Sequence, residues 1–393
     1  MEFVNIYIEK YEPAKKDGVV RYTIDFKNDK DLARFQEAFG DEQQDNESNP
    51  KFYGLTMPYQ GNKIMYEGSW YRFQLTDLKE NNIDKIIVDP ENEEEGGAFY
   101  WRKYKLEREV NSYSSLLTKI ESLNYQNAEG NDLPSFKTFS KLHVIDCGQG
   151  NWNEVWSEEN EIIIYDLGAS SKYSVKQIKN LINGRFQHFN ENSVVIYISH
   201  WDMDHFQALK YLSKNEFAKV KCVYGPSNIP NTRVYKAAID NILNNNIPFH
   251  TIPNTTRRIG HQINLNLLST SNYVDLYSAV SGRSRNQTGI VLAIKGEKKV
   301  ALLTGDHHYC KILEAIQGKY NNRKAILVAP HHGGKAGTLD IPAWLLELDV
   351  KECAISVGVN SYGHPNEHLG NLTTLIGQKP RVTELHGHLF FSI

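Results

Sequence analysis

Apolar runs that end in Gly, Asp or His recur along the larger, C-terminal part of the chain. They are, in order, KLHVIDCGQGN, EIIIYDLG, SVVIYISH, KCVYG, NLNLLS, GIVLAIKG, KKVALLTGD, KAILVAPHHGG and KECAISVGVNSYGHP. Segments with helical spacing separate several of them, namely KYSVKQIKNLING, YKAAIDNILNN, YCKILEAIQGKY and IPAWLLELD. Strands that are apolar on both faces, with polar groups gathered at their ends, are typical of a layered α/β sheet. The sequence therefore predicts an α/β fold whose functional residues lie on the loops.

Histidine content and charge divide the chain near residue 140. All 14 histidines lie at or after His143. Residues 1 to 140 carry 18 Lys and Arg against 26 Asp and Glu, whereas the remainder carries 26 against 21. Between the two parts, the stretch NYQNAEGNDLPSFKTFSK has the Gly, Asn and Pro of a linker. We predict a domain boundary near residue 135, with one domain at 1–135 and the other at 136–393.

The first domain is predicted to be a small α+β module. Its expected strands are 3–11, 18–27, 68–75, 85–89 and 98–106, and its expected helices are 29–39 and 112–123. The acidic segments GDEQQDNESNPK and DPENEEEGG are expected to be solvated loops. Nothing in this half indicates an activity, and docking of a protein partner through it stays open.

Composition predicts a globular, cytoplasmic protein that does not enter a membrane. With 393 residues, of which 40% are hydrophobic, the chain can bury a large core. It contains no apolar run of about 18 residues, and its start, MEFVNIYIEKYEPAKK, lacks the pattern of a signal peptide. The four cysteines are widely spaced, which predicts reduced, buried thiols rather than metal ligands.

The stretch SHWDMDHFQAL, directly after a buried strand, holds the densest titratable chemistry of the chain. A single His or Asp at a strand end is most often a cap or a satisfied core group. Here several such groups occur together, and burying them without a cation would be prohibitive because like charges repel and each loses its hydration. The pattern therefore predicts one or two divalent metals bound by mixed nitrogen and oxygen ligands, drawn from His200, Asp202, Asp204, His205, Asp306, His331 and His332.

Seven motifs in order make the second domain similar to the metallo-β-lactamase-fold superfamily, and within it to the soluble hydrolase domain of ComEC proteins, which take up DNA. HVIDCGQGN resembles the opening L-D-V-G-Q-G-D, IIIYDLG resembles I-D-x-G, and SHWDMDHFQAL resembles S-H-x-D-x-D-H-x-G-G. RNQTGIVL, LLTGD, VAPHHGG and ISVGVNSYGHP resemble N-x-x-S-x-V-L, L-x-T-G-D, H-H-G-S and S-V-G-x-N-x-Y-G-H-P. The resemblance implies an αββα sandwich that follows the small α+β domain.

The resemblance also implies roles for single residues. It makes His200, Asp202, Asp204 and His205 metal ligands, Asp306 a bridging ligand, and His331 or His332 the last ligand, and it implies that two Zn²⁺ or Mn²⁺ ions bind. Asp166 matches an aspartate that supports such sites without touching the metal. The catalytic candidates are Asp204 and Asp306, which would orient a hydroxide, and His364, which would protonate the leaving group or hold a phosphate. The alternative for His364 is a histidine bonded within a Pro-containing turn.

This chain also departs from the family pattern. Most members carry His where Asp202 stands, and a further His before Asp306, where only His250 and His261 occur. The oxygen-richer ligand set moves the metal preference from zinc toward manganese. DHFQAL and HHGG replace D-H-x-G-G and H-H-G-S, which predicts that the residues around the substrate differ from those of the family.

The predicted function is a metal-dependent hydrolase that uses an activated water on a nucleic-acid phosphodiester. The basic segments NTTRRIG and SGRSRN would help to attract a polyanion. Alternatives are hydrolysis of a small phosphodiester, nucleotide or lactone, since a fold does not fix a substrate. A non-catalytic, metal-binding regulatory module is the alternative from another class.

Overall fold

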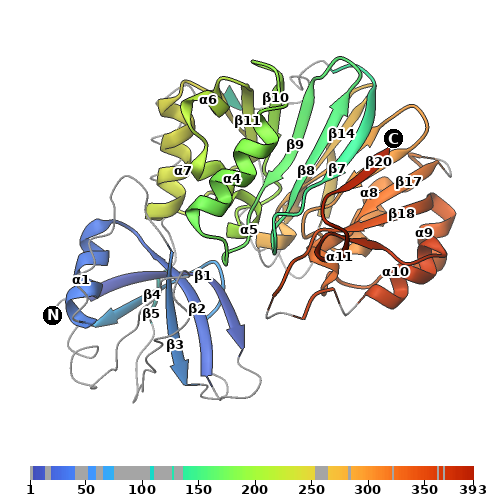
Figure 1. Cartoon of the computed structure of the whole chain (residues 1–393). Coiled ribbons are helices and arrows are strands. Elements are labelled where there is room, and N and C mark those ends of the chain that lie inside the picture. The colour runs from blue at the N-terminus through green and yellow to red at the C-terminus, as the bar shows by residue number, and fades with distance from the viewer. Residues whose placement is uncertain are drawn as a thin grey trace. The chain divides into compact units, whose positions relative to one another are not determined.

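The chain divides into two compact units in a computed structural model (Figure 1). Unit 1 comprises Met1–Lys119 and Ile229–Asn241, and unit 2 comprises Ile120–Asn228 and Ile242–Ile393. A segment from the middle of the chain therefore belongs to the N-terminal unit, and the single boundary near residue 135 stays a prediction. The structure describes residues 3–13, 19–39, 52–58, 65–74, 107–109, 126–127, 136–252, 264–281, 285–320, 323–360, 363–365 and 368–393.

Unit 1 is built on an antiparallel five-stranded sheet, ordered β3-β2-β1-β4-β5. Val4, Ile6 and Ile8 lie two residues apart in the first strand, so they share one face and pack in a core with Leu32 and Phe35 of the first helix. The predicted α+β module is confirmed for the described residues, whereas 85–89, 98–106 and 112–123 lie outside them. The elements are β1 (Phe3–Pro13), β2 (Val19–Phe26), α1 (Asp29–Phe39), β3 (Tyr53–Pro58), β4 (Ser69–Gln74), β5 (Glu107–Glu109) and most of α7 (Arg233–Asn244).

Helix α7 is held in unit 1 by buried carboxylates. The Asp25 side chain accepts hydrogen bonds from the Val234 backbone N–H, at 2.9 Å, and from the Thr232 hydroxyl. The Tyr235 hydroxyl donates to Glu9 at 2.6 Å. A carboxylate at a helix N-terminus satisfies free N–H groups and complements the helix dipole. Asp25 therefore fixes the start of α7 on the sheet of unit 1.

Asp25 gives the stability of unit 1 a pH dependence. Burial raises the pKa of Asp25 from 3.8 to about 6, although its hydrogen bonds and Arg233 oppose this. Because the folded state then binds a proton more tightly than the unfolded state, the free energy of unfolding should fall as the pH rises from about 4 to about 6. The decrease is on the order of 2 to 3 kcal/mol. Asp25→Asn should remove most of this slope in urea unfolding measured across that range.

The matched control for Asp25→Asn is Glu37→Gln, on the exposed face of α1. Its stability should follow the wild-type pH dependence. Equal slopes for wild type and Asp25→Asn would contradict the role given to the buried carboxylate.

The first sheet of unit 2, called sheet I, has eight strands in the order β20-β7-β8-β9-β10-β11-β12-β6. Its strands from β9 to β12 run parallel, and β20, β7 and β8 pair antiparallel at one side. The strands are β6 (Gln126–Asn127), β7 (Phe139–Val144), β8 (Trp152–Ser157), β9 (Ile162–Leu167), β10 (Val194–Tyr197), β11 (Val220–Pro226), β12 (Phe249–Ile252) and β20 (Leu389–Ser392).

The second sheet of unit 2, called sheet II, has seven strands in the order of the chain from β13 to β19. The strands from β13 to β16 are antiparallel, and those from β16 to β19 are parallel. The strands are β13 (Asn264–Thr270), β14 (Val274–Ser281), β15 (Ile290–Lys295), β16 (Val300–Leu303), β17 (Lys324–Val328), β18 (Asp349–Ile355) and β19 (Arg381–Val382).

The two sheets of unit 2 pack face to face, with helices on their outer faces (Figure 1). Val144 and Ile163 of sheet I share one core with Leu292 and Leu303 of sheet II. The outer face of sheet II forms a second core with buried side chains of three helices. This four-layer arrangement confirms the predicted αββα sandwich. The helices are α4 (Val175–Phe186), α5 (Met203–Phe206) and α6 (Lys214–Phe217), then α8 (Tyr309–Ile316), α9 (Ile341–Glu347), α10 (Leu369–Ile376) and α11 (Thr383–His386).

Two of the composition-based expectations can be compared with the structure. Cys147, Cys222 and Cys353 are buried free thiols, as predicted, whereas Cys310 is only partly buried. Within the described ranges, no helix is long and apolar enough to span a membrane. The cytoplasmic location stays a prediction.

Candidate metal centre

Asp166, near the end of β9, is the buried anchor of the site. Its φ of 63° is a left-handed conformation that is unusual outside glycine. Its carboxylate accepts hydrogen bonds from the Ser199 backbone N–H (2.6 Å), the Ser199 hydroxyl (2.8 Å) and the Asn151 amide (2.7 Å). It also lies 2.7 Å from Nδ1 of His205. Because Nδ1 faces Asp166, His205 presents its other ring nitrogen, Nε2, to the site.

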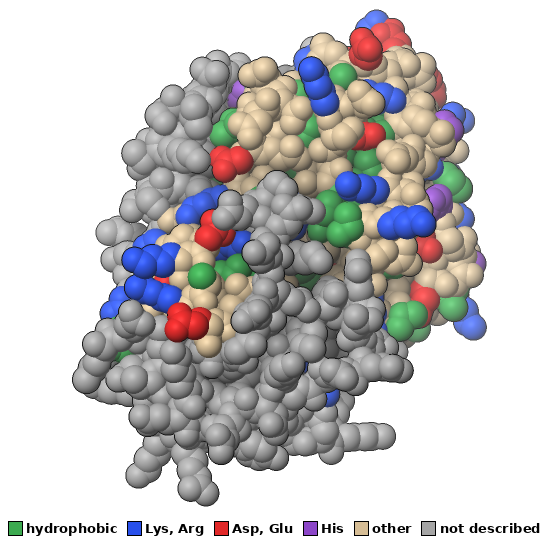
Figure 2. All heavy atoms as spheres, turned by 60° about the vertical axis from the view of Figure 1, so that its left-hand side comes forward, with side chains coloured by type: hydrophobic (Ala, Val, Ile, Leu, Met, Phe, Trp, Pro, Cys, Tyr) green, Lys and Arg blue, Asp and Glu red, His purple; other side chains and the backbone are tan. Residues whose placement is uncertain are grey.

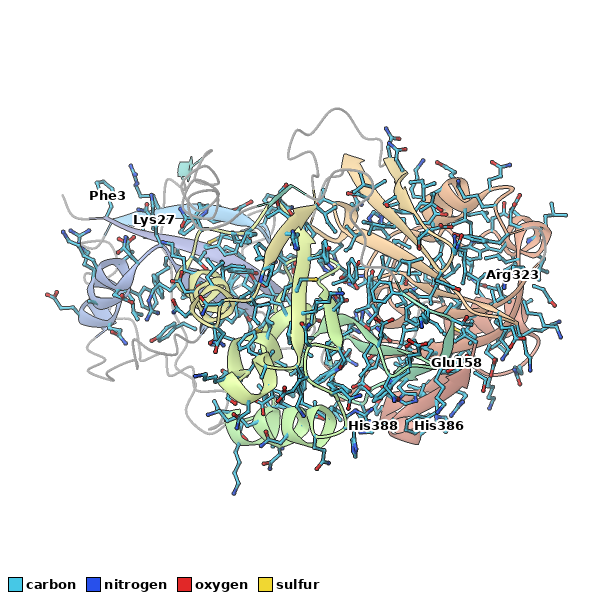
Figure 3. All side chains as sticks on the ribbon, turned by 90° about the horizontal axis from the view of Figure 1, so that it is seen from above. Phe3, Lys27, Glu158, Arg323, His386 and His388 are labelled. Carbon is cyan, nitrogen blue, oxygen red and sulfur yellow. The ribbon has the colours of Figure 1, made fainter. Side chains whose placement is uncertain are left out.

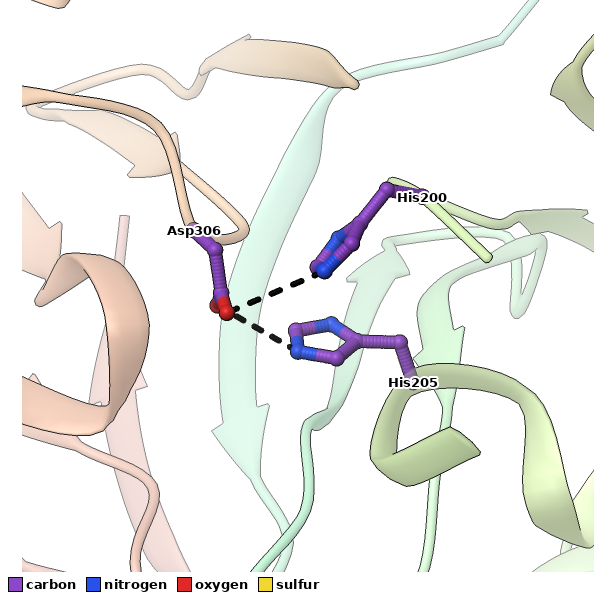
Figure 4. Close-up of side chains that lie close together, drawn as sticks. All are labelled: His200, His205 and Asp306. Carbon is purple, nitrogen blue, oxygen red and sulfur yellow. Dashed lines mark ion pairs between the residues drawn. The ribbon is translucent and has the colours of Figure 1, made fainter. Parts of the chain in front are cut away.

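Three potential ligands converge beside this anchor. His200 follows β10, His205 lies in α5, and Asp306 follows β16 of the opposite sheet. The carboxylate of Asp306 lies 3.2 Å from Nε2 of His205 and 3.7 Å from Nε2 of His200 (Figure 4). All three side chains are buried. The strand ends of both sheets thus bring these groups to one place.

The histidine pair after β17 adds one buried and one partly exposed imidazole. It lies in a short 3₁₀ turn, Pro330–Gly333, where both histidines have positive φ. Nδ1 of His332 lies 2.7 Å from the Ser356 carbonyl oxygen, and Nε2 lies 3.4 Å from the Asp204 carboxylate. The His331 side chain is 27% exposed, with Nε2 3.7 Å from Asp306. His332 is therefore the buried member of the pair, and His331 is the partly exposed one.

The donor atoms of the site fit a divalent metal. Two groups have ligand atoms within 4.8 Å of one another, namely His200, His205 and Asp306, and Asp204, His205 and His332. Among the buried side chains of the described ranges, Nε2 of all three histidines and Oδ1 of Asp306 make no hydrogen bond of regular geometry, although Nε2 of His205 and Oδ1 of Asp306 form an ion pair at 3.2 Å. Buried polar atoms without partners are rare because they cost free energy. Imidazole nitrogen and carboxylate oxygen are ligands that Zn²⁺ and Mn²⁺ accept.

The charges of the site are coupled across its buried groups. Burial alone would lower the pKa of His205, but Asp306 and Asp166 raise it well above the usual value. Burial alone would raise the pKa of Asp306, but His205, His331 and His200 lower it well below the usual value. The site therefore holds ionised carboxylates that require positive charge nearby.

Asp202 belongs to neither group of potential ligands, and it lies between Arg285 and His200. Its Oδ1 atom lies 2.7 Å from Nε of Arg285, and its Oδ2 atom lies 3.4 Å from Nε2 of His200. Burial would raise the pKa of Asp202, but Arg285 and then His200 hold it at about 2. Sequence reasoning missed Arg285, because an arginine in a basic segment is usually solvated. Its place at the start of the RNQTGIVL motif was the available signal.

His364 lies next to the histidine pair. Its ring centre is 5.1 Å from that of His331 and 6.3 Å from that of His332. Its backbone N–H donates to Oδ1 of Asn360 at 3.1 Å, as expected for a histidine within a turn. A Cβ atom on Gly334 would lie 2.0 Å from Cε1 of His364. The glycine that replaces the serine of H-H-G-S therefore leaves space that the imidazole of His364 fills.

Of the two histidines between His205 and Asp306 that the sequence offered, His250 belongs to neither group of potential ligands among the described residues. The ring of His250 stacks on Tyr224 at 4.8 Å, and His261 lies outside the described residues. His386 and His388 lie at the edge of unit 2 (Figure 3). Nδ1 of His388 accepts the Asp146 backbone N–H at 2.9 Å, which is a structural role.

No protein-family model and no curated protein matches the chain. The short form of human tRNase Z is similar at 12% identity with a TM-score of 0.40, over 64% of this chain and 99% of that one. The metallo-β-lactamase fold protein YhfI of Bacillus subtilis is similar at 14% identity with a TM-score of 0.38, over 65% and 100%. A long form RNase Z from yeast is similar at 11% identity with a TM-score of 0.32, over 83% and 51%. These values carry no argument about function, and the likeness to ComEC stays a prediction from the motifs.

Proposed function

We propose that the chain is a metal-dependent hydrolase whose leading substrate is a nucleic-acid phosphodiester. One observation carries the proposal: buried ligand atoms of His200, His205 and Asp306, and of Asp204, His205 and His332, lie within 4.8 Å of one another in the described structure. A divalent ion bound there would supply Lewis-acid and water-activating chemistry. The imidazole nitrogens of His200, His205 and His332 and the carboxylates of Asp204 and Asp306 form a mixed donor set that suits Zn²⁺ or Mn²⁺.

The residues around the ligands have distinct roles in this proposal. Asp166 fixes the ring of His205 through Nδ1, which makes it a positioning residue. Asp204 and Asp306 provide the carboxylates that would bind the ion and orient the attacking water. His364, beside the partly exposed His331, is the candidate for protonating the leaving oxygen.

The surface charge of the chain bears on the choice of substrate. The part of the chain after residue 140 carries only 26 Lys and Arg against 21 Asp and Glu. On the face shown in Figure 2, the described Lys and Arg side chains are interspersed with neutral and acidic ones. A polyanion usually meets a denser basic surface than this. This observation keeps a small phosphodiester, a nucleotide or a lactone as the second candidate.

The proposal is tested with the full chain after removal of metal by a chelator. We expect hydrolysis of DNA, RNA or bis-p-nitrophenyl phosphate to return when Mn²⁺ or Zn²⁺ is added. The absence of phosphodiester cleavage with Mn²⁺, Zn²⁺ and Mg²⁺ would overturn the phosphodiesterase assignment. Hydrolysis of a lactone under the same conditions would then support the second candidate.

His364→Ala should lose rate but keep its metal. A group that only donates a proton to the leaving oxygen contributes about 10²- to 10⁴-fold to the rate. The loss should therefore be large on a nucleic acid and small on bis-p-nitrophenyl phosphate, whose leaving group needs no proton. His188→Ala, on an exposed histidine, is the matched control and should change neither rate. Loss of metal from His364→Ala would instead make His364 a ligand.

A further inference from the structure

We propose that the chain binds one divalent ion rather than two, and that the guanidinium of Arg285 takes the place of the second positive charge beside Asp202. This inference rests on the proposed function, because it concerns the same metal centre. It replaces the pair of ions that the family resemblance predicts. Arg285 would thus be a fixed cation of the site that no added metal needs to supply.

The first observation is the place of Arg285 itself. It begins the short 3₁₀ turn Arg285–Gln287, which precedes β15. Its Nε atom lies 2.7 Å from Oδ1 of Asp202, and its Nη1 atom donates to the Trp201 carbonyl oxygen at 2.9 Å. The side chains of Arg285 and Asp202 are only 8% and 9% exposed. The guanidinium is therefore held on two consecutive residues, and a dication beside it would meet little-screened repulsion.

The second observation is that the two groups of potential ligands share His205. Its Nδ1 atom lies 2.7 Å from Asp166, so Nε2 is the nitrogen that it offers to both groups. A neutral imidazole nitrogen has one lone pair and binds one ion. Because the two groups share this one donor atom, they fit a single coordination shell, and Asp202 belongs to neither of them. Asp204, His205, Asp306 and His332, with His200 beside them, are sufficient for a single four- to six-coordinate ion.

The position of Asp202 limits where a second ion could bind. Its carboxylate already lies beside the Arg285 guanidinium, so it offers a cation less negative charge than Asp204 or Asp306 does. Asp166 is a fourth carboxylate of the site, but it lies 2.7 Å from Nδ1 of His205 and not beside Nε2.

The test is the metal stoichiometry of the full chain, measured by elemental analysis after saturation with Mn²⁺ or Zn²⁺ and removal of unbound ion. Wild type should hold one equivalent. Arg285→Gln, which removes the charge, should take up additional metal because Asp202 becomes available. Arg323→Gln, on an arginine whose guanidinium donates to the Gly296 carbonyl oxygen, is the matched control and should stay at one equivalent.

A paired substitution keeps the test decisive if a single one unfolds the chain. Asp202→Asn combined with Arg285→Gln removes both charges of the ion pair and should keep one equivalent with nearly unchanged affinity, since Asp202 is not a ligand. Two equivalents in wild type, or less metal in the paired variant than in wild type, would overturn the inference. No additional metal in Arg285→Gln would overturn the role of Arg285. No metal in wild type would overturn the proposed function instead.

Discussion

Asp306→Ala should abolish metal-dependent hydrolysis while the chain stays folded. Asp306 lies 3.7 Å from His200, 3.7 Å from His331 and 3.2 Å from His205, so three imidazoles face its carboxylate. Its loss removes an anionic ligand and should release the ion. Because metal assistance is worth several kcal/mol and about 1.4 kcal/mol is tenfold in rate, the loss should reach the order of 10³-fold. Rate and bound metal are measured on the same preparation.

Asp349→Ala is the matched control for Asp306→Ala. Asp349 lies at the start of β18, where it pairs with Lys351, and its side chain is 37% exposed. The control should keep both its metal and its rate. An Asp306→Ala variant that retains metal and more than a tenth of the wild-type rate would remove Asp306 from the centre.

Gly168→Ala should disrupt the site through the backbone. A Cβ atom on Gly168 would lie 1.8 Å from the Asp204 carbonyl oxygen and 2.8 Å from that of Asn151. The Asn151 N–H donates to the Asp204 carbonyl oxygen at 2.9 Å, so this contact fixes the loop that carries Asp204. Overpacking costs about 1 to 3 kcal/mol and sometimes more, and a backbone clash should lie at the upper end. The urea concentration at the unfolding midpoint and the affinity for metal should both decrease.

Gly184→Ala should instead increase the free energy of unfolding. Gly184 lies within α4, and a Cβ atom there would meet nothing within 4 Å. Alanine in a helix interior is more stable than glycine by roughly 0.5 to 1 kcal/mol. Gly184→Ala should therefore raise the urea midpoint and leave the metal unchanged. Equal stability changes at the two positions would show that close packing at Gly168 does not determine the fold of the site.

The convergence of the candidate residues could be predicted from the sequence because they follow parallel strands. β9 pairs with β10, and β16 pairs with β17, so residues after these strands meet at common sheet edges. Asp166 lies near the end of β9 and His200 follows β10, whereas Asp306 follows β16 and His332 follows β17. The chemistry of single residues was thus enough to point to the centre. The packing of the two sheets against each other brings these two edges together. Only the family resemblance predicted that packing.

The sequence analysis did not predict β8, β14 or the buried position of Arg285, because each depends on a partner that is distant in the chain. β8 was not predicted because Glu154 interrupts its apolar pattern, yet this carboxylate is buried and its Oε1 atom accepts a hydrogen bond from Nε of Arg185 at 3.0 Å. β14 contains Asp275, which is buried and lies 2.7 Å from Nζ of Lys295. Arg285 is a further case. A charged residue next to an unknown partner is expected at the surface, so sequence alone predicts it as solvated.

The domain membership of helix α7 could not be predicted from the sequence either. Its helical spacing was predicted, and the structure contains the helix. Its membership of unit 1 depends on Asp25 and Glu9, more than 200 residues earlier in the chain. A pattern read along the sequence carries no information on that pairing. The domain prediction therefore could not include a segment that returns to the first unit.

The most direct test of the account is anomalous diffraction from crystals of the full chain grown with Mn²⁺ or Zn²⁺. The account predicts a peak within about 2.0 to 2.3 Å of Nε2 of His205, Nε2 of His332 and carboxylate oxygens of Asp204 and Asp306. It predicts no second peak at Asp202. A chain that is saturated with metal but shows no anomalous peak among these four residues would contradict it.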